Sequence, residues 1–193
     1  MNDECFRIVG IDPGSHCFGI SVIDYDFEKK KFILRHAETF HANRVLTETS
    51  MELVLGDRGA RHSKCREFLI ERLNYFAPQL VSCESAYMKL KFVSAFQSLV
   101  EGIVMAREAV WAYKNTLPLF LIDPPTAKKA VGAPGRGGDK ESVRKAIKLL
   151  IKEKKLLVDD DVVIDDLDEH SIDSIAIGFW LCLKWQLELQ GII

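Results

Sequence analysis

The sequence lacks a paired-cysteine motif, a long apolar run and an excess of positive charge. Its five cysteines are scattered over 193 residues without a Cys-x-x-Cys pair. This spacing argues against a disulfide framework or a zinc site and predicts reduced packing residues. Without an apolar run of about 18 residues, neither a membrane-spanning helix nor a membrane partner is expected. Residues 1–4 (Met-Asn-Asp-Glu) do not resemble a signal peptide, so a cytoplasmic location is expected.

The formal net charge of −2 is unusual for a nucleic-acid binder, but the charged residues are segregated. Residues 126–155 hold ten Lys or Arg and three acids, whereas residues 156–173 hold eight acids and no Lys or Arg. Phosphate groups respond to the local field rather than to the total charge. The pattern therefore allows a nucleic-acid surface, although taken alone it favours a solvated basic helix followed by an acidic loop.

Hydrophobic periodicity predicts one α/β domain that spans residues 1–193. The chain is 48% hydrophobic, which suits a single sizeable core. The hydrophobic residues of 41–60 follow no clear helical or strand period, and Gly-Asp-Arg-Gly at 56–59 indicates a loop. The order of elements predicts a mixed sheet flanked by helices. The expected strands are 6–11, 19–23, 31–37, 80–84 and 119–122, and the expected helices are 61–76, 92–113, a short one near 126, 140–152 and 171–189.

Four residues that could carry chemistry stand at the ends of predicted elements. Asp12 ends a buried strand beside a Pro-Gly turn, which is a costly place for an unpaired charge. Glu84 ends another strand, and His170 and Asp173 share one face at the start of the last helix. Taken singly, they could be a turn aspartate, a surface glutamate, a structural histidine and a helix-start charge. Their combination indicates a shared site.

In this combination the chain resembles the RuvC family of Holliday-junction resolvases, which belong to the ribonuclease H-like superfamily. The resemblance lies in Gly-Ile-Asp-Pro-Gly-Ser at 10–15, in Cys-Glu-Ser-Ala-Tyr-Met-Lys at 83–89, and in the spacing of His170 and Asp173. It implies a five-stranded mixed sheet and two Mg²⁺ ions, for which Mn²⁺ substitutes. Asp12 would bridge the two ions, Glu84 would hold one, and His170 and Asp173 would hold the other. The family more often has aspartate at the position of His170, so metal preference could differ.

The resemblance also implies a set of DNA contacts. Tyr87 would stack on an unpaired base, and Lys140 would neutralise charge on the reacting phosphate. A core tyrosine and a solvated helix face are the alternatives. The loop 132–138 matches neither a Walker A nor a Rossmann motif and is interpreted as DNA-facing. The acid runs at 159–161 and 165–166 are interpreted as a solvated loop without metal ligands. The full set of expected DNA contacts is Tyr87, Lys89, Lys128, Arg136, Lys140, Arg144 and Lys148.

The favoured hypothesis is a homodimer that makes paired nicks in a four-way junction. The helix 92–113 would supply the dimer contact through Phe92, Phe96 and Leu99, although the same stripe could face the core. The small size and the unmatched residues 38–60 suit a phage-encoded member. Three alternatives stay open: a nuclease for flaps, forks or other branched DNA, a non-catalytic junction-binding module, and an actin-like ATPase.

Overall fold

A computed structural model describes residues 5–45, 49–86, 93–135 and 140–191. They form one mixed sheet of six strands in the order β5-β4-β1-β2-β3-β6. The first three strands are an antiparallel meander, β4 and β5 extend it in parallel beside β1, and β6 pairs in parallel with β3. The strands are β1 (Cys5–Asp12), β2 (Cys17–Asp26), β3 (Lys31–His41), β4 (Leu80–Glu84), β5 (Leu119–Ile122) and β6 (Leu156–Val158).

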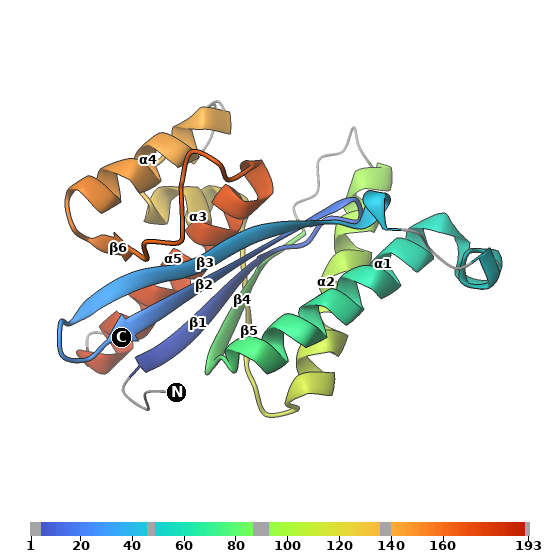
Figure 1. Cartoon of the computed structure of the whole chain (residues 1–193), viewed down its shortest axis with the longest axis horizontal. Coiled ribbons are helices and arrows are strands. Elements are labelled where there is room, and N and C mark those ends of the chain that lie inside the picture. Colours follow the sequence, from blue (N-terminus) through green and yellow to red (C-terminus); the bar gives the residue numbers. More distant parts are fainter. Residues whose placement is uncertain (1–4, 46–48, 87–92, 136–139, 192–193) are drawn as a thin grey trace.

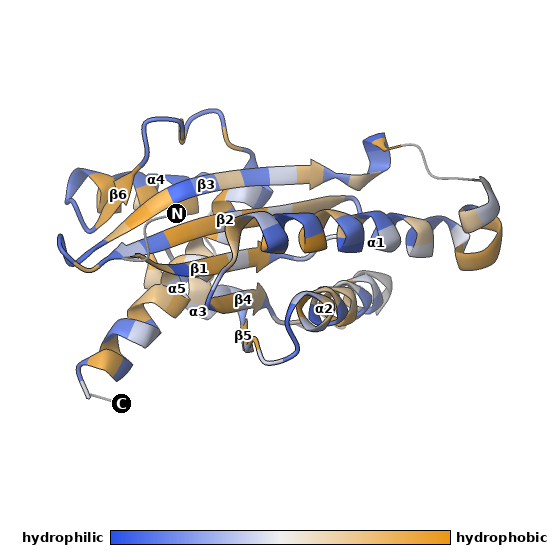
Figure 2. Cartoon of the chain, turned by 60° about the horizontal axis from the view of Figure 1, so that its bottom comes forward, coloured by the Kyte–Doolittle hydropathy of each residue, from blue (hydrophilic) through white to orange (hydrophobic). Residues whose placement is uncertain are grey.

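Helices cover both faces of the sheet (Figure 1). Alternate residues of β1 separate two cores, because Ile8 packs on the side of α4 and α5, whereas Val9 and Ile11 pack on the side of α1 and α2. The apolar stretches along the central strands are visible in Figure 2. None of the helices in the described ranges is long and apolar enough to cross a membrane. The helices are the 3₁₀ turn η1 (Ala42–Arg44), α1 (Thr49–Phe76), α2 (Val93–Tyr113), α3 (Pro124–Ala130), α4 (Lys140–Lys152) and α5 (Glu169–Leu189).

The predicted ribonuclease H-like α/β class is confirmed, with two corrections. The sheet has six strands rather than five, because β6 pairs with β3 inside the stretch interpreted as a solvated acidic loop. Helix α1 begins at Thr49 rather than near residue 61, and it is kinked at Gly56, whose φ is 69°. This part of α1 buries little apolar surface, so its sequence shows no helical period.

Helix α5 lies directly on the sheet through backbone contacts. A Cβ atom built on Gly10 would stand only 2.3 Å from the carbonyl oxygen of Ser174 and 2.5 Å from the amide nitrogen of Gly178. The Ser21 hydroxyl of β2 donates to the same Ser174 carbonyl at 2.8 Å, and Ser82 of β4 donates to the Ile177 carbonyl of α5 at 3.1 Å. Three neighbouring strands therefore fix the position of α5, and with it the side chains at its beginning.

Candidate active site

Asp12 and His170 meet where the end of β1 faces the beginning of α5. Asp12 is 9% exposed, and its Oδ2 lies 2.7 Å from Nδ1 of His170. This hydrogen bond raises the pKa of His170 against the opposing effect of burial. Gly19, paired with Asp12 across β1 and β2, allows the approach, because a Cβ there would stand 2.2 Å from the His170 carbonyl oxygen.

Glu84 and Asp173 belong to the same electrostatic cluster as Asp12. Burial, together with the negative charges of Asp12 and Asp173, raises the pKa of Glu84 to about 8. Burial likewise raises the pKa of Asp173 to about 6, with Asp12 as the next cause. Such coupling requires short distances between carboxylates in a poorly solvated place. The ends of β1 and β4 are neighbours in the sheet, where Ile11 pairs with Cys83, and the charges of Asp12, Glu84 and Asp173 influence one another.

Lys128 supplies a positive charge to this cluster. Its charge lowers the pKa of both Glu84 and Asp173, opposing burial. The residue lies on α3, whose first turn is fixed by Asp123, because that side chain accepts a hydrogen bond from the Thr126 amide at 3.0 Å. Lys128, expected from the sequence as a DNA contact, is therefore a lysine whose charge acts on the acids.

The donor set fits a hard divalent cation. Carboxylates that repel one another in a buried site are stabilised by a shared positive charge, and Mg²⁺ prefers oxygen ligands. In the described ranges, no group of three or more His, Cys, Asp or Glu side chains already surrounds one ion position. The fit therefore rests on the chemistry and mutual coupling of Asp12, Glu84 and Asp173, with His170 hydrogen-bonded to the first of them.

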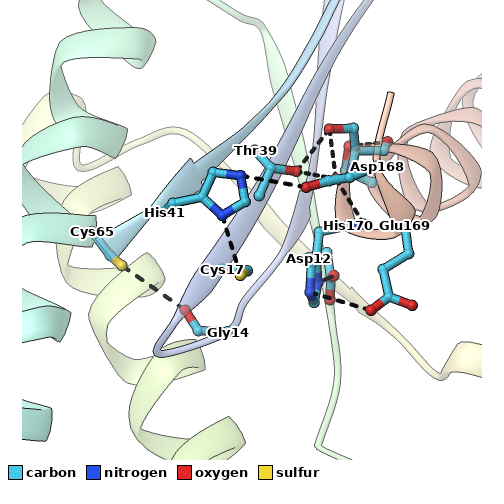
Figure 3. Close-up of polar contacts among 11 residues, drawn as sticks. Asp12, Gly14, Cys17, Thr39, His41, Cys65, Asp168, Glu169 and His170 are labelled. Carbon is cyan, nitrogen blue, oxygen red and sulfur yellow. Dashed lines mark hydrogen bonds and ion pairs between the residues drawn. The ribbon is translucent and has the colours of Figure 1, made fainter. Parts of the chain in front are cut away.

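Asp168 caps α5 and was not singled out from the sequence. Its Oδ1 accepts the amides of His170 at 3.1 Å and Ser171 at 3.0 Å, and the Thr39 hydroxyl donates to it at 2.5 Å (Figure 3). Burial acts to raise the pKa of Asp168, but these bonds outweigh burial and lower it. An aspartate directly before an apolar helix is a helix-start signal. The cap was missed because Asp168 is one of several acids between residues 159 and 169.

Figure 3 also places Cys17 and His41 beside this cap. The Cys17 sulfur lies 3.5 Å from Nδ1 of His41, and Nε2 of His41 lies 3.6 Å from Oδ2 of Asp168. Burial raises the pKa of the Cys17 thiol, and the charge of Asp168 adds to the increase. The thiol is therefore a poor nucleophile despite its histidine neighbour. All five cysteines are free thiols, and Cys65, Cys83 and Cys182 are buried packing residues.

The other expected DNA contacts have different outcomes. Tyr87, Lys89 and Arg136 lie outside the described residues, as does the side chain of Lys140, which begins α4. Lys148 is 44% exposed and pairs with Asp165, so its contact with phosphate stays a prediction.

For the dimer contact, Phe92 is likewise outside the described residues, whereas Phe96 and Leu99 are half-buried on α2.

Arg144 has a structural role, and its contact with phosphate stays a prediction. Its guanidinium donates to the carbonyl oxygens of Ile164 at 2.5 Å and Leu167 at 2.6 Å, and it pairs with Glu141. These bonds tie α4 to the segment that leads into α5. The acidic segment is thus more than a solvated loop, because Asp159 also pairs with Arg35 of β3 at 2.9 Å.

The mixed sheet and its flanking helices have the ribonuclease H-like fold. No family model matches the chain. Crossover junction endodeoxyribonuclease RuvC of Bartonella henselae is 28% identical over 148 residues, which cover 77% of this chain and 78% of the relative. Its sequence is thus similar to RuvC resolvases over most of its length, and the resemblance drawn from its motifs is confirmed.

Solved structures show the same fold at low sequence identity. T. thermophilus RuvC in complex with a Holliday junction substrate superposes with a TM-score of 0.66, at 17% identity, over 94% of this chain and 96% of that chain. The yeast mitochondrial Holliday junction resolvase Ydc2 superposes with a TM-score of 0.68, at 16% identity, over 96% of this chain and 81% of that chain. Both comparisons extend over almost the whole sequence.

Proposed function

We propose that this protein is a structure-selective DNA endonuclease that resolves four-way junctions by paired, metal-dependent nicks. The observation that carries the proposal is the convergence of Asp12, Glu84 and Asp173, from three separate elements, in one buried and electrostatically coupled site. One buried and two half-buried acids have no evident structural use there, whereas they suit cation-assisted phosphodiester hydrolysis. The junction as substrate follows from the named activity of the relatives.

The ligand set for the cations would be Asp12, Glu84, His170 and Asp173. When bound, two divalent cations supply an activated water and stabilise charge on the leaving oxygen. Asp12 is buried and held by His170 at 2.7 Å, so its carboxylate is fixed before substrate arrives. Lys128 balances part of the acid cluster and lies where it can attract the scissile phosphate. Mg²⁺ is the proposed physiological ion, with Mn²⁺ as a substitute.

A second copy of the chain would complete the enzyme. Helix α2 presents an apolar stripe to solvent, in which Val100 is 38%, Val104 45% and Trp111 58% exposed. Their spacing places them on one helix face. A two-fold contact along this stripe would match the approximate symmetry of a four-way junction and explain paired nicks. Phe96 and Leu99 would lie at the edge of that contact.

Cleavage of a synthetic four-way junction with a mobile core tests the proposal directly. Wild-type protein with Mg²⁺ should give symmetric nicks in two opposing strands, mapped on all four labelled strands. Asp12→Asn and Glu84→Gln should abolish cutting while junction binding persists. Equal cutting by Asp12→Asn would contradict the assignment of the site. A flap and a linear duplex of the same sequence serve as substrate controls, since faster cleavage of the flap would favour the alternative substrate class.

A further inference from the structure

A second concave site lies at the end of the sheet away from the acids. It is a cavity of about 560 Å³ between α4, α5 and the turn that joins β2 to β3, which is the left end of the sheet in Figure 1. In the strand register, Lys31 of β3 stands opposite Asp26 of β2, which stands opposite Cys5 at the start of β1. Asp12 lies at the other end of β1. Seven residues of strand separate the two ends by roughly 23 Å. The cavity is therefore distinct from the nuclease site.

The cavity combines an apolar floor with a basic rim. Phe32, Val131 and Phe179 line it and are almost fully buried within the core, so the floor is rigid. Leu149 also lines it and is 53% exposed, which offers an apolar surface at the mouth. Volumes of this size accommodate one or two large side chains or a small organic ligand. The exposed side chain of Leu149 is the apolar surface that a bound apolar group would remove from water.

Four lysines stand around this floor and come from three separate segments. Lys30 and Lys31 belong to the β2–β3 turn, Lys129 to α3 and Lys155 to the turn after α4. Only Lys155 has an acidic partner among the described residues, because it pairs with Glu153 at 2.7 Å. Lys30 adopts a left-handed conformation with φ of 51°, so its backbone position is set by the turn. The rim therefore carries a net positive charge, which would attract an anionic partner.

We propose that this lysine-rimmed cavity is a docking site for an acidic peptide segment of a partner protein that carries a large apolar side chain. The apolar side chain would fill the floor, and its acidic neighbours would pair with lysines on separate sides of the mouth. A small anion could reach one or two of these lysines, whereas a peptide can reach the lysines of all three segments. DNA phosphates would match the rim but would leave the cavity unfilled and the exposed Leu149 uncovered. The charge and the floor together thus favour a peptide.

Fluorescence anisotropy with a labelled probe peptide, Asp-Glu-Asp-Asp-Leu-Phe, tests the proposal on the intact protein. The control peptide is Asn-Gln-Asn-Asn-Leu-Phe. We expect the acidic peptide to bind about tenfold more tightly than the neutral one, with the difference shrinking at high salt. The double variant Lys31→Ala/Lys129→Ala and the single variant Leu149→Asp should each weaken binding of the acidic peptide by about tenfold.

Matched controls separate docking from folding and from DNA binding. Lys30→Gly removes a rim charge without backbone strain and should weaken peptide binding by about threefold, whereas Lys114→Ala, at the end of α2 on the other face of the sheet, should change nothing. Junction cleavage should be unchanged in all four variants. The proposal fails if the two peptides bind equally, or if Lys114→Ala weakens peptide binding as much as the rim variants do. It also fails if the rim variants lose junction affinity instead, because the lysines would then hold DNA.

Discussion

The backbones of Gly10 on β1 and Gly178 on α5 are in direct contact. The Gly10 Cα lies 3.4 Å from the position that a Cβ of Gly178 would take, and a Cβ on Gly10 would stand 2.5 Å from the Gly178 amide nitrogen. A Cβ on Gly178 would meet nothing closer than the Ser21 hydroxyl at 3.1 Å. The two glycines of one contact therefore tolerate side chains very differently.

This asymmetry predicts opposite sensitivities for two alanine substitutions. Gly10→Ala forces a methyl group into the α5 backbone, and we expect a loss of about 3 kcal/mol in the free energy of unfolding. Gly178→Ala is expected to cost less than about 1 kcal/mol, because the helix propensity of alanine offsets the tight contact. Urea unfolding of both variants measures the difference. Cleavage by refolded Gly10→Ala should also fall, since α5 carries His170 and Asp173. Equal stability of the two variants would contradict the tight packing at Gly10.

Lys128 and Lys129 provide a matched pair on α3. Because Lys128 faces Glu84 and Asp173, we expect Lys128→Ala to slow junction cleavage by about a hundredfold. Lys129→Ala should cleave at the wild-type rate, since this side chain lines the other cavity. Single-turnover rates at saturating protein isolate the chemical step from binding. A larger defect in Lys129→Ala than in Lys128→Ala would reverse the assignment.

The cap at Asp168 predicts a pH dependence of stability. The folded-state pKa of Asp168 is lowered, so its contribution is present above the unfolded value of about 4 and is lost as the pH falls below it. Asp168→Asn keeps a capping side chain but removes the titration. We therefore expect its unfolding free energy to fall less steeply than that of wild type between about pH 5 and pH 3. Asp160→Asn, in the same acidic segment, should keep the wild-type slope. Identical slopes for all three proteins would exclude this role of the cap.

The exposed stripe on α2 predicts that one substitution separates the proposed dimer. Val104→Asp would bury a charge in the contact, which costs several kcal/mol. Light scattering should show a monomer mass for this variant and a dimer mass for wild type. The junction products should change from paired nicks to single nicks. Leu189→Asp, at an equally exposed apolar position on α5, is the control and should leave the mass unchanged. A monomeric wild-type protein would remove the basis for paired cutting.

The elements with strong local signals were predicted well from the sequence. Buried strands with long apolar runs and the apolar last helix placed Asp12, Glu84, His170 and Asp173 at element ends, where the structure brings them together. Their motifs lie within short segments and do not depend on knowledge of distant contacts.

The missed features depend on contacts between distant segments. Strand β6 has three residues and exists because it pairs with β3 more than a hundred residues earlier in the chain. Arg144 lies in a basic stretch that suggests a phosphate contact. Its hydrogen bonds to the Ile164 and Leu167 carbonyl oxygens could be found only from the structure. Asp168 bonds to Thr39, 129 residues away. Local periodicity carries no information about such pairs.

The distance in sequence between Asp12 and His170, 158 residues, has a consequence for the cell. During synthesis the first strand emerges long before the last helix, so a growing chain holds only part of its cutting machinery. A chain truncated before residue 169 is in the same condition. On the proposed ligand set, two of the four ligands would reach the site only when the final helix has packed on β1, β2 and β4.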